Sequence, residues 1–331
     1  MKKNGKLLAF LTVLTVFMLF LAACSNGSDK GSNDPNKGEH MDGMDHENMD
    51  HGNMNHDSKN SGKGAQNTAN QNFSNAPAQF NSNAEKNLVV QNTKNITRIP
   101  AADPISASIY VSQTIWPATH EENQPGAVIL APVDQWQAAL AGADFIHHPI
   151  NGPILFIHHD NVPDQVLNEM KRLNPAGDKN GNQVVVVGEV SSNVTKQLSS
   201  YKMKHIQGKN PAELAMNVDQ AYADVSGGYP DSVIIVSSED QHKLYSIPAV
   251  NWISHMPEPV LFAAEKELPK ETIDALQKRN NKANIYILGP EKVISEDVEK
   301  QLKEYGTVYR ISGNDPVTTS IEFAKFKDED T

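Results

Sequence analysis

The residues with the most regular chemical pattern form a methionine- and histidine-rich tract near the N-terminus. Within this tract, Met-x-His recurs at a step of five residues. The candidate metal ligands are His40, Met41, Met44, His46, Met49, His51, Met54 and His56. A thioether and an imidazole one residue apart can close on one ion, and this pair of soft and borderline ligands suits Cu(I). The spacing therefore predicts copper binding, and the alternative is a low-complexity linker in which local duplication multiplied these residues.

Four further histidines flank a short apolar segment that we expect to be a strand, residues 153–157. His147 and His148 precede this segment, and His158 and His159 follow it. The two pairs are candidates to converge near the carboxyl end of the strand, where open α/β sheets bind ligands. The alternative is a set of surface or half-buried histidines, because a zinc site needs three or four ligands at fixed geometry.

Patterns typical of catalysis are missing from the sequence. There is no Gly-x-Gly-x-x-Gly after an expected strand, no phosphate-binding loop and no nucleophile elbow. We therefore predict that the protein is not an enzyme and requires no cofactor, with copper as the candidate ion for the Met/His tract and Cu(II) or silver as alternatives through its histidines.

The N-terminus has the pattern of a secretion signal that ends in a lipid attachment site. Lys2, Lys3 and Lys6 precede an apolar run over residues 7–23, and the run ends in Leu-Ala-Ala before Cys24. This ending resembles a bacterial lipobox, which implies cleavage after residue 23 and lipidation of Cys24. The alternative is an ordinary secretory signal or a stop-transfer helix. We expect a protein anchored by lipid to the outer face of the cytoplasmic membrane, where it faces the cell wall.

Composition separates a polar N-terminal segment from the rest of the 331 residues. Residues 24–87 are rich in Asn, Gly, Ser, Asp and Lys, so we expect a disordered tether that cannot bury a core. The net charge of −11 comes from dispersed acidic residues, which argues against nucleic acid as a partner. The tether would carry the Met/His tract between the lipid and a folded region.

One short motif occurs three times in the folded region. Asp103, Asn210 and Asp315 each precede a proline, and they lie 107 and 105 residues apart. A short polar side chain followed by proline is typical of the first turn of a helix, so each motif predicts a capped helix. The near-constant interval predicts tandem repeat units.

The repeats alternate short Val/Ile/Leu-rich segments with helical patterns. Residues 127–174 align with residues 233–280 without a gap. Strands of this kind are buried on both faces, which predicts mostly parallel sheets covered by helices. We expect a first unit over residues 88–204, a second over residues 205–309, and a closing strand and helix with an acidic tail over residues 310–331.

The repeat region resembles the cell wall-binding repeat 2 family of Gram-positive surface proteins. The motifs that carry this resemblance are Arg310-Ile-Ser-Gly-Asn-Asp315, Pro153-Ile-Leu-Phe156, Pro259-Val-Leu-Phe262 and the strand-end glycines Gly188 and Gly289. The resemblance implies an α/β fold of tandem Rossmann-like units that bind anionic cell-wall polymers without catalysis. It also implies polymer contacts by Arg98 and Arg310, although these arginines could instead close strand-to-helix turns.

In that family, the motif continues Asp-Arg-Tyr where this chain has Asp-Pro, so a basic and an aromatic side chain are lost. The Met/His tract separately resembles segments of copper-handling surface proteins. We therefore expect a membrane-anchored extracellular lipoprotein that binds a cell-wall polymer, with a copper-handling lipoprotein as the alternative.

Overall fold

The computed structural model describes residue 81, residues 91–92 and residues 97–330. The expected signal peptide, Cys24, the Met/His tract and nearly all of the expected tether lie outside these residues. No helix in the described part of the chain is both long enough and apolar enough to span a bilayer.

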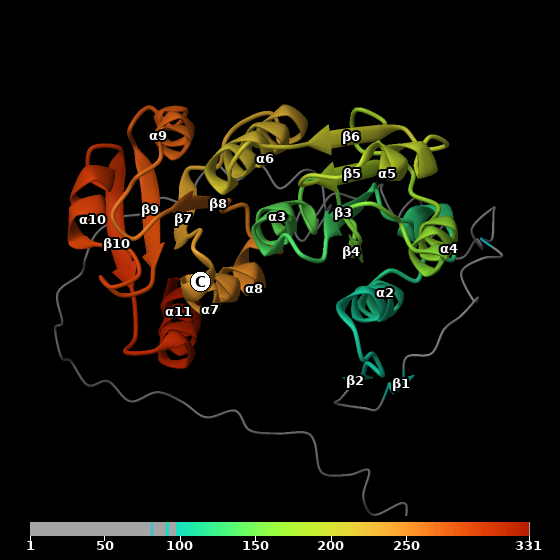
Figure 1. Cartoon of the computed structure of the whole chain (residues 1–331), viewed down its shortest axis with the longest axis horizontal. Helices are drawn as coiled ribbons and strands as arrows, with labels where there is room; N and C mark the ends of the chain where they lie inside the picture. The colour runs from blue at the N-terminus through green and yellow to red at the C-terminus, as the bar shows by residue number, and fades with distance from the viewer. Residues whose placement is uncertain (1–80, 82–90, 93–96, 331) are drawn as a thin grey trace, which may run out of the picture. The chain divides into compact units, whose positions relative to one another are not determined.

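Two four-stranded sheets carry the fold, and every strand pair within them is parallel (Figure 1). The order of strands in the first sheet is β4 (Ile154–Ile157), β3 (Val128–Pro132), β5 (Val184–Val187) and β6 (Met203–Ile206). The second sheet has the matching order β8 (Val260–Ala263), β7 (Ser232–Ser237), β9 (Ala283–Leu288) and β10 (Gly306–Ile311). The predicted α/β class with tandem units and parallel sheets is confirmed.

The unit boundaries expected from the sequence fall inside two of these strands. Residues 204 and 205 both belong to β6, and residues 309 and 310 both belong to β10. These strands end just before the second and third motifs, from which the repeat was counted. A short antiparallel pair, β1 (Gln91–Asn92) and β2 (Thr97–Arg98), precedes the first unit.

Helices connect the strands. The longer ones are α2 (Pro104–Ile115), α3 (Trp136–Gly142), α4 (Asp164–Leu173), α5 (Ser192–Gln197), α6 (Pro211–Ser226), α9 (Lys270–Gln277), α10 (Glu296–Leu302) and α11 (Pro316–Asp330). Between β7 and β8, the chain does not form one continuous helix. The chain instead forms η3 (Asp240–His242), α7 (Lys243–Ser246), η4 (Ile247–Ala249) and α8 (Val250–Ile253). Pro248 lies in the middle of this stretch, where it lacks an N–H donor and crowds the preceding turn. Single-turn 3₁₀ helices η1 (Glu121–Asn123) and η2 (Ala143–Phe145) complete the first unit.

The three capping residues behave as the sequence predicts. Asp103 accepts a hydrogen bond from the Ser106 N–H at 2.9 Å, Asn210 from the Glu213 N–H at 2.8 Å, and Asp315 from the Thr318 N–H at 2.9 Å. These backbone donors stabilise the ionised carboxylates and lower the pKa of Asp103 and of Asp315.

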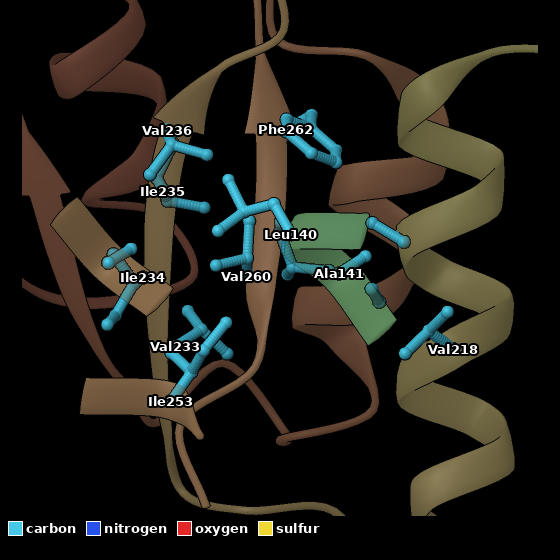
Figure 2. Close-up of a cluster of buried hydrophobic side chains, with 14 of the residues drawn as sticks. Leu140, Ala141, Val218, Val233, Ile234, Ile235, Val236, Ile253, Val260 and Phe262 are labelled. Atoms are coloured by element: carbon cyan, nitrogen blue, oxygen red, sulfur yellow. The ribbon is translucent and has the colours of Figure 1, made fainter. Parts of the chain in front are cut away.

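One apolar core cluster extends across both units, and a second lies within the first unit. Leu140 and Ala141 of α3, in the first unit, pack among residues of the second unit such as Val218 and Phe262 (Figure 2). Polar contacts reinforce this packing: Trp136 Nε1 donates to Asp240 Oδ1 at 2.7 Å, and Gln137 Nε2 donates to the Ser238 carbonyl at 3.0 Å. Helix α3 is therefore the element of the first unit that joins it to the second.

Candidate functional site

The place where an open parallel sheet usually binds a ligand is filled by protein in the first unit. This place is the crevice at the carboxyl ends of β3 and β5, where the strand order reverses. Gln135 bridges the crevice, because its Nε2 donates to the Glu189 carbonyl at 2.8 Å and its Oε1 accepts from the Glu189 N–H at 2.9 Å. A Cβ on Gly188, whose φ is +103°, would lie only 2.6 Å from Gln135 Oε1. Nothing in the sequence marks this bridge, since Gln135 belongs to no motif.

The basic side chain five residues before the capping residue makes the same contact in both sheets. In β6, a ring nitrogen of His205 lies 2.9 Å from the Gly188 carbonyl and must carry a proton to donate to it. In β10, Arg310 Nη1 donates to the Gly289 carbonyl at 2.8 Å, and its Nε donates to Glu299 at 2.7 Å. Each side chain thus hydrogen-bonds the last strand of its sheet to the glycine turn that follows the neighbouring strand.

The two arginines that the family resemblance implicates have different surroundings. Arg310 is largely buried and tied to Glu299, whose pKa is raised by burial but lowered on balance by its hydrogen bonds to Arg310 and Lys303. Arg98 lies in β2, outside both four-stranded sheets, and its side chain is exposed. Of the two, Arg98 is therefore the arginine with a side chain open to a large ligand.

The four histidines singled out in the sequence do not converge. His147 and His148 precede β4, whereas His158 and His159 follow it, so the strand separates the pairs and places them at its opposite ends. His147 instead stacks on His255 of the second unit, with ring centroids 4.6 Å apart and planes 21° apart. Sequence alignment could not reveal this contact, because it pairs His147 and His148 with Ile253 and Ser254.

The histidine group does not have the geometry of a metal site. Stacked rings direct their in-plane nitrogens along nearly parallel planes, so His147 and His255 cannot both point at one ion. Within the described residues, no group of three or more His, Cys, Asp or Glu side chains is placed to hold a metal ion. The predicted copper ligands lie outside those residues.

A serine, a histidine and a glutamate meet at the carboxyl end of β7. Ser237 Oγ and Glu239 Oε2 each lie 3.4 Å from Nδ1 of His242. A catalytic triad uses both ring nitrogens, one toward the nucleophile and the other toward the carboxylate. Because both neighbours share Nδ1 here, the group ties the strand end to η3 and does not form a triad.

Lys327 anchors the terminal helix α11 in an aromatic pocket. Its ammonium lies 2.6 Å from Glu258 and 3.9 Å and 4.7 Å from the ring centroids of Tyr286 and Trp252. Such a partly desolvated cation over aromatic faces is stabilised by the ring quadrupoles as well as by the carboxylate. Trp252 also donates to Glu258, so this tryptophan helps to hold the terminal helix in place.

Asp144 is a buried carboxyl group with no hydrogen-bond partner at either oxygen. It lies in η2, the turn after α3. Burial raises the pKa of Asp144 well above its usual value, the nearby Asp219 raises it further, and Arg279 opposes the shift. The surroundings of Asp144 therefore favour its protonated form.

We expect Asp144→Asn to stabilise the protein increasingly as the pH rises from 4 to 8. The folded-state pKa is raised above the ordinary 3.8, so the wild-type protein loses stability as the pH climbs from that value toward the folded pKa. An asparagine cannot ionise and escapes this loss, which corresponds to about 1.4 kcal/mol for each unit of pKa shift. Urea titrations at pH 4 and pH 8 measure the effect. The exposed control Asp231→Asn should differ from the wild type by the same free energy of unfolding at both pH values. If the difference between Asp144→Asn and the wild type also does not widen with pH, Asp144 does not titrate in this way.

Comparisons with known proteins agree with this architecture. No family model matches the chain. It is 26% identical over 212 residues to the Amidase enhancer of Bacillus subtilis (strain 168), an alignment that covers 63% of this chain and 27% of that protein. The structure of Cwp6 from Clostridium difficile superposes with a TM-score of 0.59 at 17% identity, covering 69% of this chain and 35% of Cwp6. Cwp8 from the same organism gives a TM-score of 0.56 at 18% identity, covering 67% of this chain and 36% of Cwp8.

The repeat region has the fold of these two clostridial proteins. The chain spans about a third of the length of each and about a quarter of the length of the enhancer. The sequence relative and the two structures each align with about two thirds of this chain.

Proposed function

We propose that the repeat region is a non-catalytic module that binds an anionic polymer of the bacterial cell wall. The observation that carries this proposal is the likeness of the two-unit region, in fold, to Cwp6 and Cwp8 and, in sequence, to the Amidase enhancer. The wall motifs in the sequence favour the same ligand class. The filled crevice at Gln135 and the single shared nitrogen of His242 support binding in preference to turnover.

The proposed polymer contact centres on Arg98. The chain carries a net charge of −11, so an anionic polymer must be held by local hydrogen bonds and not by the overall field. An exposed guanidinium offers two parallel donors to a phosphate or carboxylate. Arg310, in contrast, is occupied by hydrogen bonds to Glu299 and to the Gly289 carbonyl at the edge of its sheet.

Arg98→Ala should weaken binding to purified wall polymer about tenfold, the effect of losing roughly 1.4 kcal/mol of charge-assisted hydrogen bonding. Isothermal titration with the chain from Ser25 onward measures this, and higher salt should reduce the difference. Lys179→Ala, at another exposed cation, is the matched control and should bind as the wild type. Equal affinities for both variants would remove Arg98 from the site.

Lipid attachment at Cys24 completes the proposal and would place the module on the outer face of the cytoplasmic membrane. Two acyl signals or more are needed for stable anchoring, which lipoprotein processing supplies. Cys24→Ala should move the protein from the membrane fraction to the soluble fraction.

The name of the sequence relative favours an amidase as a protein partner. Such a partnership would show as faster wall hydrolysis by an amidase when this chain is added.

A second candidate function, copper handling, rests on the regular Met-x-His step of the tract. Methionine and histidine together select Cu(I) by ligand softness. Deleting residues 40–56 should abolish Cu(I) binding by the purified chain and leave wall binding intact. Unchanged Cu(I) binding after the deletion would exclude the tract.

A further inference from the structure

A groove in the second unit lies between two helices that contact each other, α6 and α9 (Figure 1). Its volume is about 540 Å³, within the roughly 300–1,000 Å³ that is usual for small-molecule sites. Met216, the buried Ala275 and the ring of Tyr229 supply the apolar part of its lining, and amide and charged side chains supply the rest. We call this site the α6–α9 groove.

The first unit has a charged side chain at the position that Ala275 takes in this groove. The gapless alignment pairs Ala275 with Glu169 of α4. Glu169 is buried, and its carboxylate accepts hydrogen bonds of 2.7 Å from Arg172. In the second unit, the buried ion pair is instead formed by Asp219 and Arg279. Because alanine is much shorter than glutamate, the second unit has room beside Ala275 that Glu169 takes up in the first.

One positive charge at the α6–α9 groove is not neutralised by the protein. Of the carboxylates that line the groove, Asp219 is paired with Arg279. The other, Asp274, is paired with Lys270. Lys278 also lines the groove, is exposed, and forms no ion pair with any residue in the described part of the chain. An anionic group in the groove would therefore meet an ammonium for which no carboxylate of the described chain competes.

Amide side chains of the groove offer both donors and acceptors to a ligand. Gln277 is exposed, and its amide makes no side-chain hydrogen bond to another residue that the structure describes. Asn217 donates to the Gln207 carbonyl at 2.6 Å, which leaves its Oδ1 as an acceptor. Hydroxyl groups both donate and accept, so a polyhydroxylated ligand matches these two side chains.

The aromatic side of the groove is held in place. The hydroxyl of Tyr229 donates to Gln220, and the guanidinium of Arg279 lies 5.4 Å from the centroid of its ring. A tyrosine fixed in this way presents apolar ring surface and a polar tip at low entropic cost. Together with Met216 and Ala275, it suits a ligand that is apolar on one face and polar at its rim, as a sugar ring is.

We propose that the α6–α9 groove binds a sugar unit that carries a phosphate or a carboxylate. The inference rests on the proposed function, since the groove would hold one unit of the anionic wall polymer, and it adds a site in the second unit to the contact at Arg98. The sugar ring lies on the apolar lining, its hydroxyl groups bond to Asn217 and Gln277, and its anionic substituent pairs with Lys278.

Titration of the chain from Ser25 onward with glucose 1-phosphate, followed by backbone amide signals in NMR spectra, tests the groove directly. We expect saturable shifts at Asn217, Ala275 and Gln277. Glucose alone and inorganic phosphate alone should each bind more weakly than glucose 1-phosphate, because each offers only part of the contacts.

Lys278→Ala should weaken the binding of glucose 1-phosphate about threefold, as expected for the loss of one exposed ion pair. The matched control is Lys282→Ala, which removes an exposed lysine of the same unit that does not line the groove, and its affinity should equal that of the wild type. Ala275→Glu gives the second unit the residue of the first and should abolish binding by filling the groove. The amide spectrum shows whether this variant folds, and Lys278→Ala decides the matter if it does not.

Two results would overturn the inference: no saturable shifts at the groove, or equal affinities for Lys278→Ala and the wild type. Failure of the proposed function gives a different result. A chain that binds glucose 1-phosphate in the groove but does not sediment with cell walls would contradict wall binding and leave the site. Wall binding that Arg98→Ala weakens, without shifts at the groove, would leave the function and remove the site.

Discussion

Arg279→Leu is expected to lower the free energy of unfolding by about 3–5 kcal/mol, because it leaves a buried carboxylate without its counter-ion. Arg279 and Asp219 are almost fully buried and form two parallel hydrogen bonds, of 2.8 Å and 2.9 Å. Arg279 also donates to the carbonyls of Pro230 and Ala275, so the substitution removes two further bonds.

Urea unfolding monitored by circular dichroism measures this loss. Lys270→Leu is the matched control, because the Lys270–Asp274 pair is largely exposed and such pairs contribute about 1 kcal/mol or less. The double substitution Arg279→Leu with Asp219→Leu should recover much of the lost stability, since it removes both charges. A loss for Arg279→Leu no larger than that for Lys270→Leu would mean that the pair is not buried as described.

Leu140→Ala should cost about 2–5 kcal/mol and should weaken both units together. Leu140 belongs by sequence to the first unit, but its side chain lies in the core of the second (Figure 2). Truncation therefore opens a cavity in the contact that couples the two sheets. Hydrogen exchange should show reduced protection in β3 and in β7 alike.

The control for this experiment is Val111→Ala. It also shortens an apolar side chain, but at an exposed site where the change should be within about 0.5 kcal/mol. Protection lost in only one sheet after Leu140→Ala would contradict the shared core and indicate two units that unfold independently.

Much of the fold could be predicted because its determinants are local. Four consecutive valines in β5 are buried on both faces, which is the signature of a central parallel strand. The Asp/Asn-Pro motifs predicted three helix starts, since capping depends on residues only two or three positions apart. The broken stretch around Pro248 shows the limit of periodicity, because the apolar spacing there persists while the backbone hydrogen bonds do not.

Contacts between distant segments were beyond prediction. Asp219 and Arg279 lie sixty residues apart, and nothing in their spacing marks them as partners. Lys327 stands in a segment that the sequence presents as an acidic tail, yet it is buried against Trp252 and Tyr286. Helical periodicity predicts that α3 has an apolar side. It does not predict that this side packs against the other unit.

The candidate site also combines local features that the sequence marks with distant contacts that it does not mark. The motif position shared by His205 and Arg310 was recognisable as a repeated feature, and its contact with a strand-end glycine explains the repetition. The four histidines do not converge, because residues on either side of a strand lie at its opposite ends. The copper ligands of the tract stay a prediction.

Binding to the cell wall is the central claim, and co-sedimentation with purified walls tests it most directly. The chain from Ser25 onward lacks the lipid, so the wall is the only surface present that can carry it down. We predict that it sediments with intact Gram-positive walls and stays in solution when their anionic polymers have been removed chemically. Failure to sediment with walls that keep their polymer would contradict the proposed function.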